Sequence, residues 1–141
     1  MKILNQQIFE NKEAAALPGL MESGGLPALV SGLSGIHRVN LAAALYEKLE
    51  LPMFVVCPDD SAAESFSRDL EAMLGRPVNT LYSRDFTFYP SLAASREAEQ
   101  KRLAVLNALR CGESPVTVAT VSALMQRAIP PQTLGKAAFT V

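Results

Sequence analysis

The sequence predicts an α/β domain in which a parallel sheet carries helices on both faces. The run Met53-Phe54-Val55-Val56-Cys57 is apolar at every position, as in a strand that is buried on both faces of a parallel sheet. Short apolar runs alternate with helical patterns along the chain, an order that favours parallel strands joined by right-handed helical crossovers. With 141 residues, the chain is long enough for about one domain with a single core.

Composition excludes several classes of protein. The chain is 49% hydrophobic and 19% charged, and it contains no apolar run near the roughly 20 residues that a membrane span needs. Its net charge of -1 provides no global basic field for nucleic acid. The N-terminus turns polar at Asn5, too early for a secretory signal, so we expect a cytoplasmic protein with Cys57 and Cys111 reduced. A single histidine leaves no recognisable zinc site.

The first third of the chain predicts a helix, a strand and a second helix. Residues 5–20 have a helical pattern that is interrupted at Pro18-Gly19. After a glycine-rich breaker, residues 26–31 predict the first strand, and residues 39–50 predict a helix that ends before Pro52.

The middle third continues the alternation. Residues 53–57 are the second strand, and Pro58-Asp59-Asp60-Ser61 forms a turn. Ser61-Ala62-Ala63-Glu64 fits a capping box at the start of a helix that ends at Gly75. Residues 78–82 predict a third, weaker strand.

The last third contains a helix and a fourth strand. Residues 83–94 are irregular and rich in aromatic side chains, and a helix follows up to Arg110. Residues 116–120 are the fourth strand, and residues 121–127 a short helix stopped by Pro130-Pro131. Phe139-Thr140-Val141 has the pattern of a further strand, which suggests a fragment of a longer protein.

The segment between the first strand and its helix has the position of a phosphate-binding loop. In the pattern G-x-x-x-x-G-K-[ST], backbone N–H groups cradle phosphates, a lysine reaches the terminal phosphates and a hydroxyl holds Mg²⁺. Gly32 fits the first position, and Gly35 lies inside the turn. His37, Arg38 and Val39 replace the second glycine, the lysine and the hydroxyl. An imidazole would intrude on the cradle, a guanidinium does not replace a compact ammonium, and Val39 cannot coordinate Mg²⁺.

Other candidate sites have simpler structural explanations. Asp59 and Asp60 could bind Mg²⁺, but capping of the following helix explains them. Arg96, Lys101 and Arg102 are interleaved with acidic residues, as on a solvated helix face. The aromatic cluster between Phe86 and Tyr89 could stack on a partner or a base, although packing against the sheet edge is the preferred interpretation.

Several short segments, in this order and spacing, resemble one family. They are Gly32-Leu33-Ser34-Gly35, Val56-Cys57-Pro58-Asp59, Phe88-Tyr89-Pro90, Glu99-x-x-Arg102-Leu103 and Val118-Ala119-Thr120-Val121-Ser122-Ala123-Leu124. Together they are similar to the N-terminal, UvrB-like module of the bacterial transcription-repair coupling factors (Mfd), over about residues 5–130. The resemblance implies the fold of UvrB domain 1a with a degenerate P-loop. Only about five residues separate Pro90 from Arg96, which leaves no room for the DNA-clamping hairpin of UvrB.

The resemblance also implies a function in transcription-coupled nucleotide excision repair. The complete family protein is implied to be a double-stranded-DNA translocase that uses ATP and Mg²⁺, displaces stalled RNA polymerase and recruits UvrA. Residues 1–130 would be a UvrB-like domain without cofactor, metal or catalytic residues, and residues 131–141 a linker and the first strand of a UvrA-binding module. The alternative is an active nucleotide-binding domain of a superfamily-two helicase or small α/β NTPase, with Arg38 in place of the lysine.

Overall fold

The computed structural model describes residues 7–25, 27–84 and 96–137. The chain divides into two compact units. Unit 1 comprises Met1–Pro52 and Arg68–Pro77, and unit 2 comprises Met53–Ser67 and Val78–Val141. The predicted aromatic cluster from Phe86 to Tyr89 and the strand over Phe139–Val141 lie outside the described residues.

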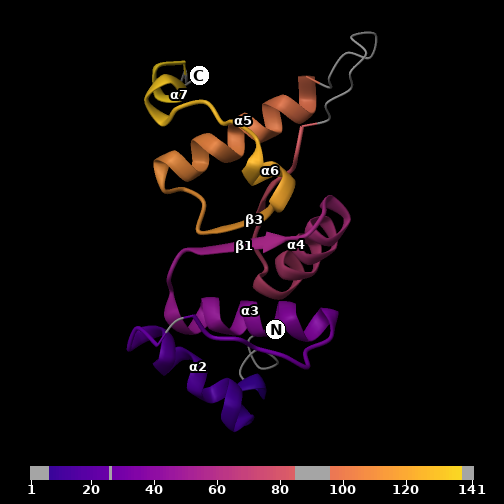
Figure 1. The fold of residues 1–141 in the computed structure, drawn as a ribbon, viewed down its shortest axis with the longest axis vertical. Coiled ribbons are helices and arrows are strands. Elements are labelled where there is room, and N and C mark those ends of the chain that lie inside the picture. Colours follow the sequence, from indigo (N-terminus) through magenta and orange to yellow (C-terminus); the bar gives the residue numbers. More distant parts are fainter. Residues whose placement is uncertain (1–6, 26, 85–95, 138–141) are drawn as a thin grey trace. The chain divides into compact units, whose positions relative to one another are not determined.

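Unit 1 is helical. After the short 3-10 helix η1 (Ile8–Glu10), the chain forms α2 (Lys12–Glu22) and α3 (Gly35–Leu49) (Figure 1). Buried side chains on α3 recur at helical spacing and form the core of the unit, namely Val39, Leu41, Ala43, Ala44 and Tyr46. The Lys48 ammonium lies 4.6 Å from the centre of the Phe9 ring, and the Arg76 guanidinium lies 4.5 Å from the centre of the Tyr46 ring.

Two predictions for this unit are wrong. The first helix continues through Pro18, which is buried inside α2, to Glu22. A proline removes one backbone donor, and the burial of its ring offsets part of that loss. The strand predicted over residues 26–31 is not formed in its described part, residues 27–31. Leu29 is 94% exposed, and Pro27 lacks the N–H that a strand ladder needs.

Unit 2 contains a sheet of three parallel strands. The order among the described residues is β1 (Met53–Cys57), β3 (Val116–Thr120) and β2 (Asn79–Leu81), and Figure 1 shows β1 beside β3. Val55 is in register with Val118, and Thr80 pairs with that same residue from the other side. The predicted strands at 53–57 and 116–120 are confirmed, and the weak third strand is shorter than predicted.

Helices lie on opposite faces of this sheet. From α4 (Asp60–Leu74), the Ser67 hydroxyl shares a 2.7 Å hydrogen bond with that of Thr80. From α5 (Arg96–Cys111), Val105 packs with Leu81 and Ala119. Because Thr80 and Leu81 are consecutive residues of one strand, they point to opposite faces, and so do the helices that contact them. This arrangement confirms the predicted α/β fold class.

The central strand is buried at all five positions, including two threonines. The Thr117 hydroxyl shares a 2.7 Å hydrogen bond with that of Ser114, which also accepts a 2.7 Å bond from the Asn79 amide. Thr120 caps α6 (Val121–Met125) by accepting a 3.1 Å bond from the Ala123 N–H. Buried hydroxyls are tolerated here because each has a partner.

The chain after α6 forms one more helix. Where the sequence predicted a linker from residue 131, the structure has α7 (Pro131–Ala137), with Leu134 buried. A Cβ at Gly135 would lie 3.2 Å from the guanidinium of Arg110 on α5, a tight contact with the flexible end of that side chain. Within the described residues, no helix is long and apolar enough to cross a membrane.

Candidate functional site

The loop from Gly32 to Val39 forms the N-terminal turn of α3. Gly32 has a φ of 79°, a conformation that glycine adopts without strain, and α3 begins at Gly35. The helix predicted to start at Val39 therefore begins four residues earlier. Because residues 27–31 form no strand, the loop lacks the strand-to-helix setting in which a P-loop cradles phosphate.

His37 interacts with the residue that precedes the helix. The Ser34 hydroxyl and His37 Nδ1 lie 2.7 Å apart, and both residues are exposed. Ser34 is the N-cap residue, but its side chain makes no capping bond to the backbone. The imidazole thus satisfies a local hydroxyl at the position where the P-loop pattern requires a glycine.

Arg38 and Val39 have opposite environments. Arg38 is exposed, and its backbone N–H donates to the Ser34 carbonyl at 3.1 Å as part of the helix. Val39 is only 2% exposed and belongs to the core of unit 1. A saturated, buried side chain at the position of the Mg²⁺-binding hydroxyl offers no ligand atom.

The predicted capping role of Asp59 and Asp60 is confirmed in part, and the capping box at Ser61 is wrong. Asp59 caps α4, because its Oδ1 accepts a 2.8 Å bond from the Ala62 N–H. Asp60 is the first residue of the helix, and its Oδ2 accepts a 3.1 Å bond from the Ser83 hydroxyl. Ser61 lies inside the helix rather than at its cap. No group of three potential metal ligands occurs among the described residues.

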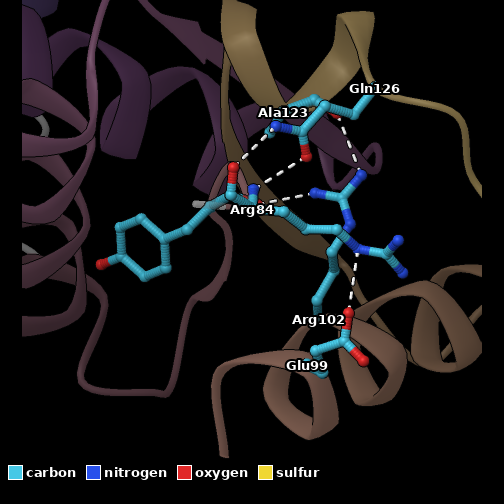
Figure 2. A network of polar contacts seen from close by, with 6 residues as sticks. Arg84, Glu99, Arg102, Ala123 and Gln126 are labelled. Atoms are coloured by element: carbon cyan, nitrogen blue, oxygen red, sulfur yellow. Dashed lines mark hydrogen bonds and ion pairs between the residues drawn. The ribbon is translucent and has the colours of Figure 1, made fainter. Parts of the chain in front are cut away.

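A network of polar contacts lies where β2 and β3 end (Figure 2). Arg102 of α5 is 5% exposed and donates to two backbone carbonyls, that of Tyr82 at 2.6 Å and that of Ala123 at 3.0 Å. Its Nε has no hydrogen-bond partner within the described part of the chain. Burial, and to a lesser extent the neighbouring charge of Arg84, lower the pKa of Arg102.

Gln126 completes this network from the other side. Its Oε1 accepts a 2.8 Å bond from the Arg84 N–H, and its Nε2 donates a 3.1 Å bond to the Arg84 carbonyl. The Arg84 side chain reaches Glu99, with Nε and Oε1 3.4 Å apart. The amide of Gln126 therefore pairs with Arg84 as a neighbouring strand would, and it links the segment after β2 to the segment after α6 (Figure 2).

Arg102 is buried, which is contrary to its predicted position on a solvated helix face. Lys101 is on a solvated face, as predicted, and forms a 2.7 Å ion pair with Glu97 one turn away. Arg102 instead occupies the apolar stripe of α5, since Val105, Leu106 and Leu109 follow it at three, four and seven positions. That spacing was the available signal for a buried arginine.

These features define the chain as an α/β domain with a parallel sheet in unit 2 and an exposed turn at the start of α3. No family model matches the chain, and no solved structure matches it. The chain is 31% identical over 130 residues to a transcription-repair-coupling factor of Bacillus subtilis (strain 168), an alignment that covers 88% of this chain. The chain is therefore similar to part of a transcription-repair-coupling factor, as predicted from its motifs, and it spans about 10% of that relative's length.

Proposed function

We propose that this chain is a non-catalytic scaffold and docking module of a transcription-repair coupling factor. The observation that carries the proposal is the turn at His37, Arg38 and Val39. Its imidazole is hydrogen-bonded to Ser34, its arginine is exposed, and its valine is buried in the core. Binding of ATP would require a phosphate cradle, a cation directed into it and a hydroxyl for Mg²⁺, and these side chains supply at most the charge.

Similarity to the coupling factor supports a part in DNA repair coupled to transcription. For the complete protein we propose an ATP-dependent translocase on double-stranded DNA that displaces stalled RNA polymerase. The residues that hydrolyse ATP with Mg²⁺ would lie in other domains. The present chain would support the recruitment of UvrA, mainly through the module that follows it, and would act in the cytoplasm.

Calorimetric titration with millimolar Mg²⁺-ATP tests whether the chain binds nucleotide, which a catalytic domain would have to do. We expect no saturable heat from the chain, and the same flat titration from the Arg38→Ala variant. A micromolar affinity that depends on Mg²⁺ and is abolished by Arg38→Ala would contradict the proposal. It would favour an active nucleotide-binding domain in which the guanidinium replaces the lysine.

A second experiment locates the docking surface for UvrA. A longer form of the protein that includes the next module should retain UvrA on an affinity column, whereas residues 1–141 should retain little or none. Tight binding by residues 1–141 alone would place the docking surface in this domain. Failure of both forms to bind would contradict a role in recruitment.

A further inference from the structure

We draw no further inference here: the strongest candidate, the apolar surface patch that Val121, Leu124 and Met125 expose on α6 beyond the end of β3, carries no proposal because nothing in the structure shows what covers it.

Discussion

The turn at the start of α3 and the network at the end of the sheet place their polar side chains in opposite environments. At the turn, His37 and Arg38 occupy positions associated with phosphate chemistry, yet both are exposed. In the network, Arg102 comes from a charged helix, yet it is buried and donates to two backbone carbonyls. The comparison teaches that the position of a residue in a motif does not predict whether its side chain is buried and hydrogen-bonded. Its position on the apolar stripe of a helix does.

Arg102→Met tests the buried side of the comparison and should have the largest effect on stability. Methionine fills most of the space but leaves the carbonyls of Tyr82 and Ala123 without their donors, at a cost of about 2–4 kcal/mol in the free energy of unfolding. Urea denaturation measures it. Lys101→Met is the matched control on the same helix, and we expect no measurable change because Lys101 forms an exposed ion pair with Glu97. Equal stability of the two variants would contradict a structural role for Arg102.

Val39→Thr tests the other region and should have an intermediate effect. It restores a hydroxyl at the position of the Mg²⁺ ligand, but Val39 is buried in unit 1. Placing an unpaired hydroxyl there should cost about 1–3 kcal/mol. Arg38→Ala, at the exposed neighbouring residue, should change stability by less than about 0.5 kcal/mol. Stability is measured by thermal and urea unfolding.

A gain of Mg²⁺-dependent ATP binding by Val39→Thr would contradict this view of the turn. It would mean that the turn at the start of α3 can bind nucleotide once a single Mg²⁺ ligand is restored. The expected result is a less stable protein with no added affinity. That outcome would show that Val39 contributes to packing in the core of unit 1 and not to the chemistry that its position in the P-loop pattern suggests.

The fold could be predicted wherever periodicity and burial coincide. β1 and β3 were predicted at their observed bounds because continuous apolar runs between turn residues have few other interpretations. The strand predicted at residues 26–31 is wrong because a short apolar run next to a proline does not show whether a partner strand is available. Pairing is a property of the assembled sheet, and the sequence of one segment does not contain it.

The polar network was less predictable than the fold. A helix in which Lys101 and Arg102 follow Glu97 and Glu99 has the composition of a solvated face, and composition does not distinguish the two cations. Their angular positions do, since Arg102 lies in line with Val105 and Leu109. The contact of Gln126 with Arg84 joins residues 42 positions apart, and no local pattern indicates it.

Removal of the cap of α4 should have the smallest of the expected effects on stability. It compares two neighbouring residues, Asp59 and Ser61, as candidates for the cap. Asp59→Ala removes the acceptor of the Ala62 N–H and should lower the free energy of unfolding by about 1 kcal/mol. Ser61→Ala should be neutral or slightly stabilising, because Ser61 is inside the helix and alanine is the better helix former. If Ser61 were instead the cap, the order of the two effects in urea unfolding would reverse. The difference matters because Asp59 is also the acidic residue after β1 that could suggest Mg²⁺ binding, and a measured capping contribution accounts for it without a metal.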